Sequence, residues 1–227
     1  MNAVENVLSS LTVGDGVAVG PLTLFPLLAE TATSPINYLL LNEALEQKVI
    51  EITEVGDGGS VPELRVVNVG AIPVLVIEGE QLIGALQNRT LNSSVLLGGH
   101  SETIIPVSCT EAGRWCPVSV KFRSSGRHSH PRLRHMKTQS VYENLCYGGR
   151  RRSDQHAVWN EVERVSAHLG SRSTTGDYEA AHDEAKRRRG DEAEQVTLPE
   201  NAVGMAVVTA NGVEVVQGDL RDPELAD

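Results

Sequence analysis

The chain has 227 residues and a formal net charge of −10 at pH 7. This length suits one domain with a full hydrophobic core, so we expect a single domain over residues 1–227. The apolar runs are far shorter than the ~20 residues of a membrane-spanning helix, and the start of the sequence lacks the pattern of an export signal. The three cysteines are odd in number and lack paired spacings, which argues against a disulfide framework or a zinc site. We therefore expect a soluble, cytoplasmic protein.

Charge is distributed unevenly along the chain. Residues 114–152 contain ten Lys and Arg and one acid, Glu143, whereas the segments on either side are acidic. Such a basic band can bind an anion such as a phosphate, or it can neutralise acidic neighbours within the fold. A second cluster of cations, at 186–189, falls in the last turn of a predicted helix, where the helix dipole favours positive charge. We therefore expect no nucleic-acid binding.

The first half of the sequence predicts an antiparallel sheet. Short β-branched runs recur about every ten residues between Gly, Pro and Asn, a spacing typical of a sandwich or barrel. Turn residues such as Asp57, Gly58 and Gly59 separate the runs, and a short helix is predicted at 42–48 with Asn42 as its cap. The predicted strands are Val49–Val55, Leu64–Val69, Pro73–Ile77, Gln81–Leu86, Ser93–Leu97 and Thr103–Cys109.

The second half changes to helical periodicity. Apolar residues recur at helical spacing between Ser153 and Gly170, which predicts a helix bounded by these two residues. The other predicted elements are helices at 138–147 and 177–189, and a hairpin of residues 202–209 and 213–216 around Asn211-Gly212 that joins the sheet. Together they predict an α+β fold: an N-terminal antiparallel β-sandwich or barrel-like sheet, two or three helices and a closing β-hairpin.

A first polar cluster lies in the stretch GEQLIGALQNRTLNSS, at residues 79–94. A buried amide without hydrogen-bond partners costs about 2–7 kcal/mol, so such groups must pair with one another or face a ligand. Glu80, in the same stretch, is expected to form an ion pair with Arg89 or to act as a proton acceptor. The polar residues in the link between the two apolar strands are Gln87, Asn88, Arg89 and Asn92.

A second cluster ends the apolar strand of IPVSCTEAGRW, at residues 105–115. Arg114 beside Trp115 suits a ligand with a phosphate and a ring, because guanidinium groups bind phosphate and indoles stack on bases. Alternatively, Trp115 covers the core and Arg114 pairs with Glu111. Cys109 is a weaker candidate for a nucleophile, because a cysteine at the end of an apolar strand is more often a buried apolar residue.

A third cluster, RRSDQHAVW at residues 151–159, places Asp154 and Gln155 in the first turn of a predicted helix. Acids there usually cap the helix, but the free amides of a helix start, preceded by the arginines at 150–152, could also bind phosphate. The hydroxyls of Ser171, Ser173, Thr174 and Thr175, before the next helix, form a second set of that kind, and the sequence does not decide between the two sets.

Three histidines, His128, His130 and His135, have a spacing that could ligate a metal. Three arginines beside them would repel a divalent cation, and no carboxylate lies near in sequence. We therefore expect no metal site and no cofactor, and interpret this segment as a flexible loop that faces an anion.

The motifs GEQLIGALQNR, IPVSCTEAGRW and SDQHAVW, in this order, resemble the domain family named for its association with ADP-ribosylglycohydrolases and rhodanese-phosphatase proteins. The resemblance runs from about Leu39 to near Val216. It implies a role linked to ADP-ribose metabolism in a microbial, intracellular setting, with an ADP-ribosylglycohydrolase as a candidate partner. The family usually continues after the hairpin into a Phe-bearing segment and a final helix, whereas residues 219–223 here read DLRDP. We therefore expect a shortened C-terminal end and assign no role to Asp219 and Asp222.

Three functions follow from these observations. In the first, the chain binds ADP-ribose or a related nucleotide phosphate. In the second, it is a hydrolase whose arginines stabilise developing negative charge. In the third, it is a structural partner of an ADP-ribosylglycohydrolase, and the polar motifs are internal networks. The candidate ligand-binding residues are Gln87, Asn88, Arg89, Asn92, Arg114, Trp115 and Gln155, and the candidate general bases are Glu80, Glu111 and Asp154.

Overall fold

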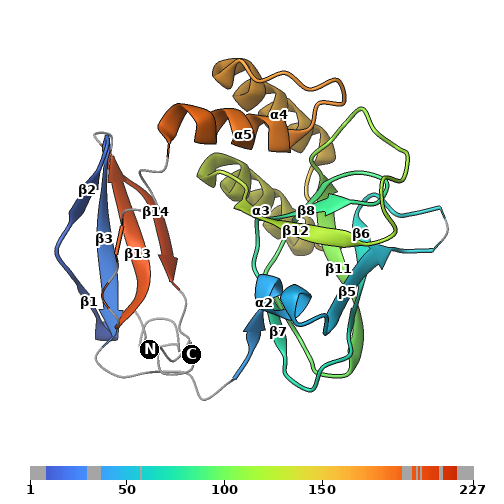
Figure 1. Ribbon diagram of the computed structural model, residues 1–227, viewed down its shortest axis with the longest axis horizontal. Helices are drawn as coiled ribbons and strands as arrows, with labels where there is room; N and C mark the ends of the chain where they lie inside the picture. Colours follow the sequence, from blue (N-terminus) through green and yellow to red (C-terminus); the bar gives the residue numbers. More distant parts are fainter. Residues whose placement is uncertain are drawn as a thin grey trace. The chain divides into compact units, whose positions relative to one another are not determined.

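The computed structural model describes residues 9–29, 37–56, 58–190, 196–197, 199, 201–209 and 212–218. The chain divides into two compact units, one made of residues 1–37 and 189–227 and the other of residues 38–188 (Figure 1). The predicted α+β class is confirmed, with strands before the helices and a hairpin after them. Four residues singled out in the sequence, Asp57, Asn211, Asp219 and Asp222, lie outside the described residues.

The described part of the first unit is a five-stranded antiparallel sheet in the order β1-β3-β13-β14, with β2 also paired to β3. One edge of β3 pairs with β1 and β2, and the other pairs with β13, where Ala206 lies opposite Phe25. The predicted hairpin is therefore confirmed, but it joins this sheet and not the sheet of the predicted first-half strands. The strands are β1 (Leu11–Val13), β2 (Val17–Val19), β3 (Leu22–Ala29), β13 (Ala202–Thr209) and β14 (Gly212–Gly218).

The second unit contains a six-stranded antiparallel sheet in the order β12-β8-β9-β11-β6-β5. The long strand β11 pairs with β6 along its first part and with β9 along its last part, and the sheet curls into a half-barrel. The strands are β5 (Ile50–Glu54), β6 (Glu63–Asn68), β8 (Glu80–Gly84), β9 (Arg89–Leu91), β11 (Ser101–Cys109) and β12 (Phe122–His128). A smaller sheet in the order β10-β7-β4 consists of β4 (Leu39–Leu40), β7 (Val74–Val76) and β10 (Val95–Leu97).

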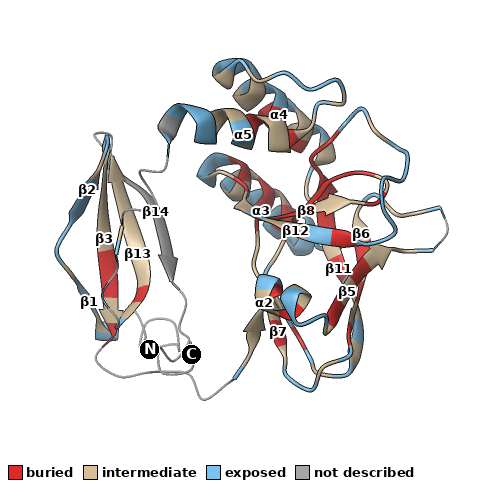
Figure 2. Ribbon diagram, viewed as in Figure 1, coloured by how far each residue is buried: buried red, intermediate tan, exposed pale blue. Residues whose placement is uncertain are grey.

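The main core of this unit lies where the inward-facing residues of both sheets meet helix α2 (Leu41–Glu46). Strand β6 shows the period of two that this requires, because Leu64, Val66 and Asn68 are buried and their neighbours are half-buried. Figure 2 shows the buried positions along these strands. The predicted cap Asn42 is wrong, because Leu40 occupies the cap position of α2. The backbone N–H of Leu40 donates a hydrogen bond to the carboxylate of Glu43.

Three longer helices, α3 (Pro131–Cys146), α4 (Gln155–Leu169) and α5 (Tyr178–Arg189), gather beside the six-stranded sheet (Figure 1). They share a second apolar cluster that includes Leu133, Val158 and Tyr178. Helix α4 ends at the predicted Gly170, which has a φ of 62°, and begins one residue later than predicted, since Asp154 and not Ser153 is the cap and accepts hydrogen bonds from two first-turn amides. In the described part of the chain, no helix combines the length and apolarity needed to cross a membrane.

The predicted loop around the three histidines is wrong. His128 ends β12, His130 occupies the cap position of α3, and His135 lies within that helix. His130 Nδ1 is 2.5 Å from the hydroxyl of Tyr178, and His130 Nε2 is 2.9 Å from the carboxylate of Glu161, so this ring joins all three long helices. The polar sequence hid a strand and a helix start because their stabilising contacts are distant in the chain: β12 pairs with β8, and His130 at the start of α3 contacts α4 and α5.

Candidate functional site

Strands β9 and β11 bring the first two predicted motifs together, with Arg89 opposite Cys109. The side chain of Gln87 donates to the backbone carbonyl of Glu111 over 2.9 Å, and the backbone N–H of Asn88 donates to Glu111 Oε2 over 3.2 Å. All of these side chains are buried. Distant polar groups of the two motifs therefore form one connected network at the end of β11, and Asn88, Glu111 and Arg114 of this network also line a cavity of about 490 Å³.

Within this network the guanidinium of Arg114 is fully used by protein acceptors. Its Nε donates to Glu111 Oε2 over 2.9 Å, and the ion pair between the two residues closes to 2.7 Å. The two terminal nitrogens donate to the carbonyls of Ala85, Cys116 and Gly84 and to Asn88 Oδ1. Arg114 therefore ties the β8–β9 connection to the end of β11, and the geometry favours a positioning role over direct ligand contact.

The carboxylate of Glu111 is similarly committed. Burial alone would raise its pKa, but hydrogen bonds from Arg114, Thr175 and the backbone of Asn88 outweigh burial and lower the pKa. Glu111 Oε1 accepts from the Thr175 hydroxyl over 2.7 Å. A carboxylate stabilised in its charged form by three donors is a poor proton acceptor, so this geometry does not favour Glu111 as a general base.

Arg89 is fully buried, and its Nη1 donates to Gln87 Oε1 over 2.8 Å and to Cys109 Sγ over 2.6 Å. The expected ion pair with Glu80 is wrong, because the carboxylate nearest to Arg89 is that of Glu54, with Oε1 3.7 Å from Nη2. The indole of Trp115 covers the guanidinium at 5.6 Å. Burial raises the pKa of the Cys109 thiol to about 11, so this thiol is protonated at neutral pH and does not suit a nucleophile.

Glu80 lies apart from this network, at the start of β8. Its Oε2 accepts a hydrogen bond from the backbone of Ile77 over 2.9 Å. Burial raises the pKa of Glu80 to about 7, against the lowering effect of that hydrogen bond. A carboxylate that titrates near neutral pH has the pKa of a general base, but Glu80 does not line the α4 cavity described below.

The remaining predicted residues hold elements together. Asp154 accepts from the backbone N–H groups of His156 and Ala157, so these two amides at the start of α4 are already bonded and not open to a phosphate. The side-chain amide of Gln155 bonds to both backbone groups of Cys109, at 2.8 and 2.9 Å, and joins α4 to β11. Asn92 Oδ1 accepts from the Ser108 hydroxyl over 2.8 Å.

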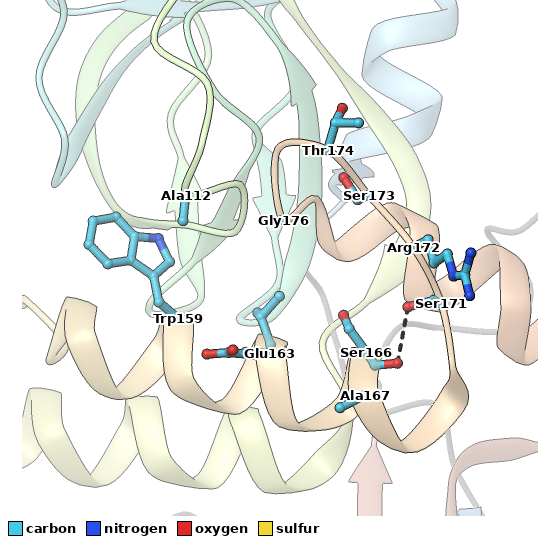
Figure 3. Close-up of a pocket in the computed structure, with 11 residues that line it drawn as sticks. Ala112, Trp159, Glu163, Ser166, Ala167, Ser171, Arg172, Ser173, Thr174 and Gly176 are labelled. Carbon is cyan, nitrogen blue, oxygen red and sulfur yellow. Dashed lines mark hydrogen bonds between the residues drawn. The ribbon is translucent and has the colours of Figure 1, made fainter.

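A cavity of about 620 Å³, the α4 cavity, lies between helix α4 and the loop that leads to α5. Trp159, Glu163 and Ser166 line it from one face of α4, at the i, i+4 and i+7 spacing of a helix (Figure 3). The opposite wall is the loop 171–176, and Ala112 lines the cavity from the end of β11. Figure 3 shows Trp159 at one end of this set and Arg172 at the other.

The polar network of the predicted motifs holds the loop wall of this cavity. The N–H of Gly113 donates to the Thr175 carbonyl over 2.7 Å, next to the bond from the Thr175 hydroxyl to Glu111. The side-chain amide of Asn88 donates to Asp177 Oδ1 over 3.0 Å, and that same oxygen accepts from the first turn of α5. The predicted residues therefore shape the α4 cavity from behind, although they do not themselves line it.

A family model for the ARG and Rhodanese-Phosphatase-superfamily-associated Protein domain, ARPP-1, matches residues 10–222. The chain belongs to the ARPP-1 family. The match spans residues of both compact units, and it confirms the resemblance seen in the three sequence motifs. The ARPP-1 family takes its name from association with ADP-ribosylglycohydrolase and rhodanese-phosphatase proteins. Searches of curated proteins and of solved structures gave no match.

Two residues of this ARPP-1 domain that line the cavity were not among the predicted site residues. Trp159 closes the third motif, and Arg172 stands in the hydroxyl-rich run 171–175 that was an alternative anion site. Each looks solitary in the sequence, since the two residues are 13 positions apart. The signal that could have found Trp159 is the helical spacing of α4, because Trp159, Glu163 and Ser166 recur at the i, i+4 and i+7 positions of one face.

Proposed function

We propose that this ARPP-1 domain binds ADP-ribose or a related nucleotide phosphate in the α4 cavity. The observation that carries the proposal is that an indole, Trp159, and a guanidinium, Arg172, line one cavity of about 620 Å³. Arg172 makes no hydrogen bond or ion pair with another residue of the described part of the chain. A cavity of this volume is in the range of small-molecule sites, and an aromatic ring with few polar groups is their usual lining.

The chemistry of the lining matches the parts of a nucleotide. The indole of Trp159 offers a face on which a base can stack. The guanidinium of Arg172 offers paired donors to a phosphate, and the hydroxyls of Ser173 and Thr174 beside it are further donors. Glu163 lies between the two ends, where its carboxylate can accept hydrogen bonds from ribose hydroxyls (Figure 3).

The predicted ligand residues take a supporting role in this proposal. Arg114, Glu111 and Asn88 bond to one another and to the loop that carries Arg172, so they fix the loop before a ligand arrives. A wall that is already in place lowers the entropy cost of binding. The same reasoning explains why a sequence motif rich in amides and guanidinium groups need not contact the ligand.

Isothermal titration calorimetry with ADP-ribose, ADP and inorganic phosphate tests the proposal. We expect saturable binding of ADP-ribose that Arg172→Ala weakens by about tenfold to a hundredfold, since a hydrogen bond to a charged group contributes about 1.5–3 kcal/mol. Arg65→Ala is the matched control, because Arg65 is a half-exposed arginine that pairs with Glu102 on the six-stranded sheet. Absence of binding to every nucleotide, or equal binding by the Arg172→Ala variant, would refute the α4 cavity as the site.

A further inference from the structure

Arg89 has an unused pair of donors in a fully buried guanidinium. Its Nη1 is occupied by Gln87 and Cys109, whereas Nε and Nη2 have no hydrogen-bond partner in the described part of the chain. The Nε–H and one Nη2–H point in parallel from one edge of the guanidinium, and this edge matches two oxygens of a carboxylate or phosphate. Buried donors are nearly always hydrogen-bonded in native proteins, so two unbonded donors on one guanidinium indicate a binding position for an acceptor group.

Glu54 balances the charge of Arg89 without bonding to this edge. Its Oε1 lies 3.7 Å from Arg89 Nη2, beyond hydrogen-bond distance, and accepts instead from the backbone N–H of Leu86 over 3.2 Å. Its Oε2 is buried and has no hydrogen-bond partner among the described residues. Glu54 is therefore an internal anion that stands next to the free edge of Arg89 and competes electrostatically with any other anion there.

The side chain of Trp115 covers the guanidinium of Arg89. Its indole lies 5.6 Å from the guanidinium carbon of Arg89, and 49% of the residue is exposed to solvent. It belongs to the segment between β11 and β12, in which residues 112–121 form neither helix nor strand. A side chain that is half in water and carried by an irregular segment can move aside at lower cost than one from a strand or helix.

We propose that Arg89 is a receptor for an oxyanion, a carboxylate or a phosphate group, which enters when the Trp115 side chain moves aside and displaces Glu54 as counter-ion. The site is separate from the α4 cavity, since none of its three residues lines that cavity. The irregular segment connects the two, because Ala112 lines the α4 cavity and Trp115 covers Arg89. Binding at Arg89 does not depend on nucleotide binding at α4.

Fluorescence of Trp115 tests the proposal directly. The chain has two tryptophans, so in a Trp159→Phe background Trp115 is the one remaining indole. Titration with inorganic phosphate and, separately, with acetate distinguishes a phosphate from a carboxylate as the preferred oxyanion. We expect a saturable change in Trp115 emission with at least one of them, and the same change after Arg172→Ala, which alters only the α4 cavity. No saturable change with either anion overturns the proposal.

Two substitutions then assign the response to Arg89 and Glu54. Glu54→Gln removes the competing charge with little change of shape, and we expect it to tighten anion binding at least tenfold. Glu102→Gln, an exposed carboxylate on β11, is the control and should leave the affinity unchanged. Arg89→Lys keeps the charge but loses the paired donors, and we expect at least tenfold weaker binding. Equal affinity in the Glu54→Gln variant contradicts the proposal even if Arg89→Lys does not fold.

Discussion

The hydroxyl of Thr175 donates a hydrogen bond of 2.7 Å to Glu111 Oε1, and this bond joins the end of β11 to the loop that walls the α4 cavity. The two residues are 64 positions apart in the chain. The carboxylate of Glu111 thereby serves two sides at once, because its other oxygen pairs with Arg114. The loop is therefore held by a hydrogen bond to the Glu111 carboxylate, and the guanidinium of Arg114 stabilises the charged form of that carboxylate.

Gly113→Ala should disturb the loop wall without touching a ligand. A Cβ at Gly113 would lie 3.0 Å from the Cα and from the carbonyl oxygen of Thr175, so the loop must shift. We expect a loss of about 1–3 kcal/mol in the free energy of unfolding, as for other overpacked sites, and weaker ADP-ribose binding. Urea denaturation and calorimetry measure both. Gly98→Ala is the control, since its nearest contact would be an ordinary 3.8 Å from Ser101.

Arg114→Ala should act chiefly on stability. The substitution leaves the buried carboxylate of Glu111 without its guanidinium partner, and removal of one member of a buried ion pair costs about 3–5 kcal/mol. We expect a lower urea midpoint with a cooperative transition. A variant of unchanged stability that has lost nucleotide binding would instead mean that Arg114 contacts the ligand itself.

Substitutions of Asp154 separate a helix cap from a general base. Asp154→Ala removes the acceptor for the first-turn amides of α4 and should cost about 1 kcal/mol of stability. Asp154→Asn keeps a capping oxygen, so we expect near-normal stability and unchanged ligand binding. If the protein proved to be a hydrolase and the Asn variant lost its turnover, Asp154 would be a catalytic residue and not merely a cap.

Glu80→Gln should change how stability depends on pH. Burial raises the pKa of Glu80 from 4.5 to about 7, so between these values the folded state holds a proton that the unfolded state releases. The free energy of unfolding of the native protein should therefore fall by about 3 kcal/mol as the pH rises from 4.5 through 7. Glutamine does not titrate, and urea denaturation across this range should show a shallower fall for the variant. Parallel curves would contradict the raised pKa.

Lys137 should make the free energy of unfolding rise with pH in the alkaline range, opposite to the fall that Glu80 causes at lower pH. Burial lowers the pKa of Lys137 from 10.5 to about 8, against the raising effect of Glu78, so in this window the unfolded state binds the extra proton. The contribution of Lys137 to the free energy of unfolding should rise by about 3 kcal/mol between pH 8 and 10.5. The comparison is with Lys137→Met, in which this rise should be missing. A variant that follows the native slope would show that Lys137 titrates as it does in water.

The sequence predicted best those strands and helices whose defining residues lie within or next to the element itself. The strands β5, β6, β7 and β11 follow β-branched runs between turn residues, and α4 has both a capping aspartate and a terminal glycine. Strand β3 was not predicted, because Pro26 interrupts its apolar run and its partner β13 lies far along the chain. Strand β12 was missed because its sequence, FRSSGRH, is polar and its pairing with β8 supplies the order.

The candidate site shows the same division between local and distant information. The sequence indicated that Gln87, Arg89 and Arg114 need partners, and the structure brings them together. It could not indicate that all the guanidinium nitrogens of Arg114 donate to neighbouring residues while two nitrogens of Arg89 have no partner among the described residues. That difference depends on the register of β9 against β11. Nor could it place Arg172 opposite Trp159, since the turn after α4 determines where the loop runs.

The pairing of β3 with β13 also orders events during synthesis. Strand β3 leaves the ribosome early, but the edge that β13 covers must wait until the whole second unit and residues 202–209 have been made. The middle of the chain can therefore complete its fold while the first strands are still unpaired on that side. Until then, the exposed edge of β3 is a place where a nascent chain could pair with another copy of itself.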